Sequence, residues 1–177
     1  CFFTDACQAS GALSLKVDDL GVDLMAISSS KIYGPKAVGC LYLRKGIVLE
    51  AQMVGGGQER NIRSGTENAA LIIGLGEALS IADDMREGES ERLTQLRDFM
   101  MQEVVKIPGV TINGHNTKRL PKNVHITVTQ AEGESVMLFL NEKGIYCSTG
   151  SACAASDIEA SHVLTAIGHN NDGIHGS

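Results

Sequence analysis

Short apolar segments separated by turns fill the first third of the chain, and they restrict its fold more than any other feature. Residues 22–27 (VDLMAI) and 39–44 (GCLYLR) have the composition of buried strands, and residues 1–4 (CFFT) end another strand at Asp5. A Gly-Pro turn at residues 34–35 separates two of these segments. Because near-continuous apolar strands are typical of sheets that are covered on both faces, the pattern predicts an α/β fold.

The middle of the chain is expected to be helical. Residues 64–67 (SGTE) match the capping box, in which serine and a glutamate three positions later cap the start of a helix. Residues 69–85 are apolar on almost every side, which predicts a buried helix. A break is expected at residues 86–90 (REGES), and apolar residues at helical spacing over residues 93–104 predict a second, amphipathic helix.

The last third of the chain changes to shorter elements of both kinds. Strands are expected at residues 110–112, 124–129 and 145–147, and helices at residues 134–142 and 161–167. We therefore expect two domains. Residues 1–87 form part of a large α/β domain, and residues 88–177 form a linker helix and a small C-terminal α+β domain.

The charge and the cysteine content exclude several classes of protein. The 177 residues have a net charge of −6 and a pI near 5.3. Nucleic acid is therefore not expected as the main partner, because phosphate binding requires a basic surface. No apolar run approaches the roughly 20 residues that span a bilayer, so no membrane association is expected. The five cysteines are widely spaced and odd in number, which favours reduced thiols in the cytoplasm.

Two local features have the residue types of a cofactor site. Lys31 directly follows a predicted buried strand, where partial burial would lower its pKa toward that of a nucleophilic amine. The hydroxyls of Ser28 and Ser30 lie beside it in sequence and are suited to a phosphate group, although Lys31 could also be a solvated loop residue. Asp5 could bond the pyridinium nitrogen of a cofactor or cap the turn that follows it.

A loop of small residues at positions 147–156 (CSTGSACAAS) is the third feature. Low crowding and exposure in such a loop favour a reactive thiolate. The spacing of Cys147 and Cys153 does not match a zinc site, so no metal is expected. Cys40 lies inside a strand pattern and is expected in the core, whereas the role of Cys7 stays open.

Four motifs follow one another along the chain: TDACQ, SSSKIYGPK, GGGQERNIRSGT and STGSAC. In this order and at these separations they resemble the NifS/IscS-type cysteine desulfurases, which belong to the class V aminotransferase group of fold-type I pyridoxal-phosphate (PLP) enzymes. The resemblance implies a PLP-binding large domain with a mainly parallel sheet. It also implies that L-cysteine is converted to L-alanine in a cytoplasmic homodimer, and that the sulfur passes to an acceptor or scaffold protein for iron–sulfur cluster assembly.

The resemblance also implies roles for single residues in binding the cofactor. Lys31 would bind PLP covalently, and Asp5 would pair with the nitrogen of the pyridine ring. Gln8 would bond the ring hydroxyl, and Ser28 would hold the phosphate. Thr66 would reach the phosphate of the cofactor in the neighbouring subunit.

Cys153 is implied as the nucleophile that attacks the substrate sulfur and becomes a persulfide.

Three positions depart from the family's pattern. Ser30 stands where the family usually has histidine, and it can still donate to phosphate. Cys7 replaces a small or aliphatic residue, and Ala37 stands where glycine is common.

The chain is also shorter than the family's pattern, and it lacks an initiating methionine. The first strands, the phosphate-binding turn and the ring-stacking histidine of the large domain are missing, as is the arginine that would bind the substrate carboxylate. We therefore expect an internal or C-terminal fragment. Two alternatives stay open: a selenocysteine lyase or other class V enzyme, and a non-catalytic piece that acts in dimerisation or docking.

Overall fold

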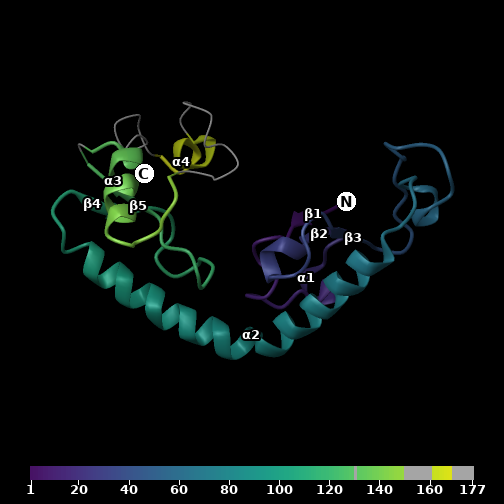
Figure 1. Ribbon diagram of the computed structural model, residues 1–177, viewed down its shortest axis with the longest axis horizontal. Helices are drawn as coiled ribbons and strands as arrows, with labels where there is room; N and C mark the ends of the chain where they lie inside the picture. The colour runs from purple at the N-terminus through teal and green to yellow at the C-terminus, as the bar shows by residue number, and fades with distance from the viewer. Residues whose placement is uncertain (130, 150–160, 169–177) are drawn as a thin grey trace. The chain divides into compact units, whose positions relative to one another are not determined.

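The computed structural model describes residues 1–129, 131–149 and 161–168, and these form two compact units, residues 1–91 and 92–177 (Figure 1). The long helix α2 passes from the first unit into the second. Along the chain, the elements are β1 (Phe3–Asp5), α1 (Val17–Leu20), β2 (Leu24–Ser28), the 3₁₀ helix η1 (Ser29–Ile32), β3 (Gly39–Leu43), the short turn η2 (Glu59–Asn61), α2 (Ala69–Val104), β4 (Val110–Ile112), β5 (Ile126–Val128), α3 (Gly133–Glu142) and α4 (His162–Ala166).

The first unit contains a three-stranded sheet in the order β1-β2-β3, at the positions where the apolar segments predicted strands. β1 lies parallel to β2, with Asp5 opposite Ala26. β3 lies antiparallel to β2, with Gly39 opposite Ser28. The connection between β2 and β3 is shorter than the dozen or so residues that a parallel crossover requires, so the chain returns in the opposite direction. The predicted α/β class is confirmed.

The core of the first unit forms around β2 and the residues next to the ends of β1 and β2. Ala6, Val22, Met25 and Ile27 are buried together. Cys40 was expected in this core, but it is exposed. It lies on β3, which forms one edge of the described sheet, so its side of that strand has no covering layer.

Helix α2 differs from the predicted pair of helices in two ways. It begins at Ala69 rather than at the predicted capping box, because the side-chain oxygen of Asn68 accepts the N–H of Leu71 at 3.2 Å. It also continues without interruption through residues 86–90, where a break was expected. This stretch contains strong helix formers, and an ion pair between Arg86 and Asp83 at 3.0 Å stabilises the helical turn. These two contributions offset the cost of about 1 kcal/mol that Gly88 adds inside a helix.

The apolar residues of α2 are also less buried than predicted. Within residues 69–85 only Leu75 is buried, and Ile73 keeps 71% of its surface exposed. Small residues of α2 contact the segments around Gly11, Gly34 and Pro35, and exposed apolar residues such as Ile73 lie elsewhere on the helix surface. No helix in the described part of the chain is long and apolar enough to cross a membrane.

The described residues of the second unit form a two-stranded antiparallel sheet, β4 and β5, followed by α3 and α4 (Figure 1). Val110 lies opposite Val128 in this sheet. The strand expected at residues 145–147 does not form. The N–H of Ile145 instead donates to the carbonyl of Leu140 at 2.9 Å, so it caps the end of α3 and is not available to a ladder.

Candidate functional site

The carboxyl ends of β1 and β2 lie at the same edge of the sheet, because these two strands are parallel. Asp5 ends β1 and Ser28 ends β2, so the register that pairs Asp5 with Ala26 places both side chains at this edge. Gln8 follows in the turn after β1 and is exposed. Ligands of α/β proteins commonly bind at the carboxyl ends of strands, so this edge is the candidate cofactor site.

Lys31 lies on η1, the single 3₁₀ turn that follows β2 without a linker. Ser29 and Ile32 of this turn are buried, and they hold its backbone against the unit. Lys31 itself is exposed, whereas the sequence predicted partial burial. The turn directs Lys31 away from the core, since it buries the residues on its opposite face.

Two hydroxyl groups flank the lysine. The oxygens of Ser28 and Ser30 lie 3.2 Å apart and share a hydrogen bond. Neither side chain is fully buried, so both can donate to an oxyanion that approaches from solvent. Two adjacent hydroxyls beside an ammonium group suit a phosphate, and this pair occupies the place where the related motif has serine and histidine.

Asp5 is held as a carboxylate by the turn that it caps. Its Oδ1 accepts the backbone N–H of Cys7 at 2.9 Å, and this hydrogen bond lowers the pKa of Asp5 below its usual range. The same hydrogen bond fits the capping role considered for Asp5, and it keeps the group charged for a cationic ring nitrogen. A carboxylate that stays ionised is what such a partner requires.

The thiol of Cys7 is half-buried in the turn that Asp5 caps. Burial, and then the neighbouring carboxylate of Asp5, raise the pKa of Cys7, while the positive charge of Lys31 acts in the opposite direction. The sulfur approaches the carbonyl of Ala26 at 3.8 Å, so Cys7 packs as a neutral thiol against β2.

Thr66 lies in the loop between β3 and α2, and its side chain is exposed. The preceding residues Glu59–Asn61 adopt left-handed backbone conformations, with φ of 47°, 58° and 63°. The N–H of Gly65 donates to the side chain of Gln58 at 3.1 Å, which fixes the loop next to Thr66. The sequence motif located this loop, but its signal for the left-handed turn was weak, because only Asn61 of the three residues belongs to a type that favours this conformation.

Three further positions from the sequence analysis have different outcomes. Cys153 lies outside the described residues, so its predicted role stays a prediction. Cys147 is described and exposed. Ala37 has a φ of 64°, a conformation that favours glycine, which explains why glycine would suit this turn.

The residues at the carboxyl edge of β1 and β2 fit PLP by their chemistry. An ionised carboxylate at Asp5, a pair of hydroxyls at Ser28 and Ser30, and the amine of Lys31 match the nitrogen, phosphate and aldehyde groups of that molecule. No group of three or more metal-ligating side chains occurs among the described residues.

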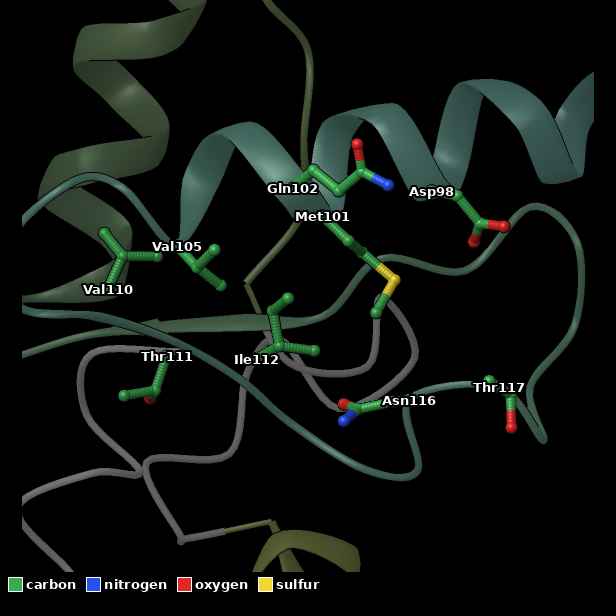
Figure 2. Close-up of a pocket in the computed structure, with 9 residues that line it drawn as sticks. All are labelled: Asp98, Met101, Gln102, Val105, Val110, Thr111, Ile112, Asn116 and Thr117. Atoms are coloured by element: carbon green, nitrogen blue, oxygen red, sulfur yellow. The ribbon is translucent and has the colours of Figure 1, made fainter.

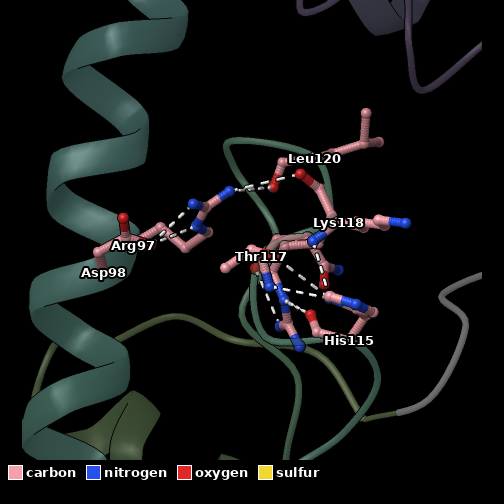
Figure 3. Close-up of polar contacts among 8 residues, drawn as sticks. Arg97, Asp98, His115, Thr117, Lys118 and Leu120 are labelled. Atoms are coloured by element: carbon pink, nitrogen blue, oxygen red, sulfur yellow. Dashed lines mark hydrogen bonds and ion pairs between the residues drawn. The ribbon is translucent and has the colours of Figure 1, made fainter.

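A buried polar network in the second unit was not anticipated from the sequence. The guanidinium of Arg97, on α2, is buried and donates to Asp98 at 2.8 Å (Figure 3). It also donates to the carbonyls of Arg119 and Leu120 at 3.4 and 3.5 Å. The sequence signal for this network was the spacing of Arg97, which lies four residues after Leu93 and four before Met101 and therefore on the same face of the helix.

Arg119 and His115 organise the loop that follows β4. Arg119 donates to the carbonyl of His115 at 2.8 Å, and Nδ1 of His115 accepts the N–H groups of Thr117 and Lys118 at 3.1 and 3.0 Å (Figure 3). Burial, and then the charge of Arg97, lower the pKa of Arg119. These bonds satisfy the backbone of the loop, so the network is structural.

A shallow groove of about 600 Å³ lies between the end of α2 and this loop (Figure 2). It contains none of the predicted site residues, and its floor is mostly apolar. The residues that line it are Asp98, Met101, Gln102, Val105, Val110, Thr111, Ile112, Asn116 and Thr117.

Comparison with known proteins agrees with the sequence motifs. Cysteine desulfurase IscS from Dictyoglomus turgidum is 49% identical over 177 residues, which cover 99% of this chain and 45% of that protein. Cysteine desulfurase IscS from Methanosarcina thermophila is 48% identical over 176 residues, which cover 99% of this chain and 44% of that protein. The chain therefore spans about half the length of the curated relatives that it matches.

The fold agrees with that of solved relatives. The X-ray structure of a NifS-like protein from Rickettsia africae superposes with a TM-score of 0.87 at 28% identity, over 99% of this chain and 46% of that one. The aminotransferase class-V family matches residues 1–170. The resemblance to NifS/IscS-type desulfurases and the fold-type I architecture are thus confirmed, and the chain belongs to the class-V aminotransferase family.

Proposed function

We propose that this chain functions in a PLP-dependent cysteine desulfurase, which converts L-cysteine to L-alanine and retains the sulfur as a persulfide. The main support is the carboxyl edge of the parallel pair β1 and β2. It brings together Asp5, Ser28 and Lys31, in a chain whose relatives are named cysteine desulfurases.

In the cofactor-binding part of the site, each residue has a distinct task. The ionised Asp5 holds a proton on the nitrogen of the pyridine ring, and Gln8 donates to the ring hydroxyl. Ser28 and Ser30 donate to the phosphate, and the amine of Lys31 attaches the cofactor. When bound, PLP supplies an electron sink for bonds that break at the substrate's carbon atoms.

The sulfur-transfer step belongs to Cys153. Its thiolate attacks the substrate sulfur, so an S–S bond forms as the C–S bond of the substrate breaks. The released electron pair stays on the substrate carbon, which then takes up a proton. L-cysteine and the Cys153 thiol thus yield L-alanine and a persulfide on Cys153, and no other oxidant is required.

Three features of the assembly belong to the same proposal. Thr66, which is exposed in its loop, reaches the phosphate of the cofactor in the neighbouring subunit of a homodimer. The persulfide is passed to a sulfur-acceptor or iron–sulfur scaffold protein. The reaction takes place in the cytoplasm, where thiols stay reduced.

The experiment uses the cofactor-loaded enzyme and three variants. We expect Lys31→Ala to abolish the visible absorbance of covalently bound cofactor and its borohydride-stable label. We expect Cys153→Ser to keep that absorbance and to lose the persulfide that wild type forms from L-cysteine, as measured by mass spectrometry. Cys147→Ser is the matched control in the same loop, and it should form the persulfide at the wild-type level.

Three results would change the proposal. If Cys153→Ser kept full persulfide formation, the nucleophile would be another thiol. If selenocysteine released alanine much faster than cysteine did, the enzyme would be a selenocysteine lyase. A folded protein that binds a scaffold but no PLP would instead support the docking module.

A further inference from the structure

We propose that Gly74 of α2 is a positioning residue for Lys31, an inference that rests on the assignment of Lys31 as the cofactor lysine. Gly74 provides the space in which the ring of Pro35 sits. A Cβ atom at Gly74 would lie 2.6 Å from Cγ and 3.2 Å from Cδ of Pro35, closer than real Cβ contacts allow. The helix and the segment that follows Lys31 are therefore in direct contact through a position that accepts no side chain.

The contact continues along the segment toward the lysine. Gly34 packs against Ala78, where an added Cβ atom would lie 2.8 Å from the methyl carbon, and it would also collide with the hydroxyl of Ser29. The N–H of Gly34 donates to the carbonyl of Ser29 at 3.0 Å, so it closes the turn that contains Lys31. Tyr33 has a φ of 61°, which reverses the chain directly after that turn.

The stripe on α2 that receives this segment consists of small residues four positions apart. Gly74 meets Pro35, Ala78 meets Gly34, and Ala82 lies beside Gly11. Residues four apart lie on one face of a helix, so these positions form one continuous ridge. Ile32, the residue after Lys31, is 5% exposed and also lies near Gly11.

This packing explains how an exposed lysine can be held accurately. The side chain of Lys31 has no burial to restrict it, so the position of its amine depends on the backbone of η1. That backbone is fixed on one side by β2 and on the other by its contact with α2. A reactive group held on rigid elements needs such support, because a displacement of about 1 Å can cost about a hundredfold in rate.

The test compares Gly74→Ala with Gly76→Ala in the full-length enzyme. Both glycines lie inside α2, so both substitutions raise helix propensity equally, but a Cβ atom at Gly76 meets nothing within 4 Å. In the protein without cofactor, we expect Gly74→Ala to speed amide hydrogen exchange at Gly34 by about tenfold, because overpacking displaces the turn. We expect Gly76→Ala to leave this exchange unchanged.

In the cofactor-loaded enzyme, we expect Gly74→Ala to shift the pH midpoint of the absorbance of the lysine-bound cofactor, and Gly76→Ala to leave it in place. Pro35→Ala removes the two ring atoms that the new methyl group would meet. The double variant should therefore recover the wild-type exchange and midpoint more nearly than Gly74→Ala does. If Gly74→Ala does not fold, Pro35→Ala alone should still speed exchange at Gly34, because it removes the same contact without adding bulk.

The outcomes separate this inference from the proposed function. If Lys31→Ala kept the absorbance of bound cofactor, the assignment of Lys31 would be wrong, whatever Gly74 does. If Lys31→Ala lost it while Gly74→Ala behaved like Gly76→Ala in exchange and pH midpoint, the positioning role would be wrong. If Gly74→Ala lowered the free energy of unfolding but left the pH midpoint of the cofactor absorbance unchanged, Gly74 would contribute to packing alone and not to the positioning of Lys31.

Discussion

Asp5 combines a structural and a chemical task in one carboxylate. One oxygen accepts the N–H of Cys7 and shapes the turn after β1, and the hydrogen bond keeps the group ionised. The charged carboxylate suits a cationic partner. The turn therefore prepares the carboxylate before any cofactor binds, which reduces the reorganisation that binding requires.

The lowered pKa of Asp5 predicts a specific acid response. Because the pKa of Asp5 is lowered in the folded chain, the stabilising effect of its carboxylate is present above the pKa of the unfolded chain and is lost as the pH falls through the lower, folded pKa. We expect Asp5→Asn, which can keep the hydrogen bond without titrating, to show a shallower loss of stability on acidification. Urea midpoints measured from about pH 5 to about pH 2 test this. Equal slopes for both proteins would contradict it.

Ser29 contains a polar atom in an apolar position. The residue is fully buried, and among the described residues its hydroxyl has no hydrogen-bond partner. An unpaired buried hydroxyl destabilises the fold, so we expect Ser29→Ala to raise the free energy of unfolding by about 1 kcal/mol. Denaturant unfolding measures the change.

Ser10 provides the control for Ser29. It is also buried, but its hydroxyl donates to the carbonyl of Cys7 at 3.0 Å. Ser10→Ala should therefore lower the free energy of unfolding by about 1 kcal/mol, since it leaves that carbonyl without the bond. If both variants lowered the free energy of unfolding, the hydroxyl of Ser29 would be paired.

At the scale of elements, α2 is one continuous helix, although its local sequence predicts two helices separated by a break. The stretch around Gly88 contains polar residues and a glycine, as an interhelical turn would, yet the helix passes through it. No proline interrupts the ladder, and the charged residues form ion pairs along the helix surface. A glycine weakens a helix without ending it.

The continuity of α2 makes Gly88 a site for stabilisation. A Cβ atom there meets nothing within 4 Å, so we expect Gly88→Ala to raise the free energy of unfolding by about 1 kcal/mol through helix propensity. Gly21 also has open space but a φ of 63°, so Gly21→Ala should destabilise. Thermal unfolding compares the two. A lower melting temperature for Gly88→Ala would mean that the helix is broken there.

At the scale of the whole molecule, the chain exposes sheet edges and large apolar side chains. In the described residues, β1 and β3 each pair with β2 alone, and Phe3 on β1 is 53% exposed. Unpaired edges of this kind add strands from other chains. The 177-residue chain is therefore prone to associate through its sheet.

A charge on the edge strand should weaken that association. We expect Phe3→Lys to reduce the association of the 177-residue chain through this edge, because an edge lysine opposes strand pairing. Leu138 is 55% exposed and belongs to the helix α3 rather than to a strand, so Leu138→Lys is the matched control and should associate as before. Sedimentation velocity measures both. Equal effects would point to general solubility rather than to the edge.

Much of the fold and part of the site could be predicted from the sequence, because the signals were local. Apolar runs predicted the positions of β2 and β3. Asp5 and Lys31 were predicted at strand ends because each follows an apolar run. Predictions failed where the outcome depended on distant partners. Residues 145–147 have strand formers but no partner strand in the described part of the chain, and Lys31 is exposed because the other face of its turn is buried.

The sequence by itself determined which residues can take part in the chemistry and where along the elements they lie, since a motif is a property of neighbouring residues. Only the tertiary structure decided which of them meet. The parallel register places Asp5 beside β2, and the ridge on α2 receives the turn of Lys31 at Gly74. Such contacts join residues that are far apart in the chain, so they depend on packing and strand pairing, which no local pattern specifies.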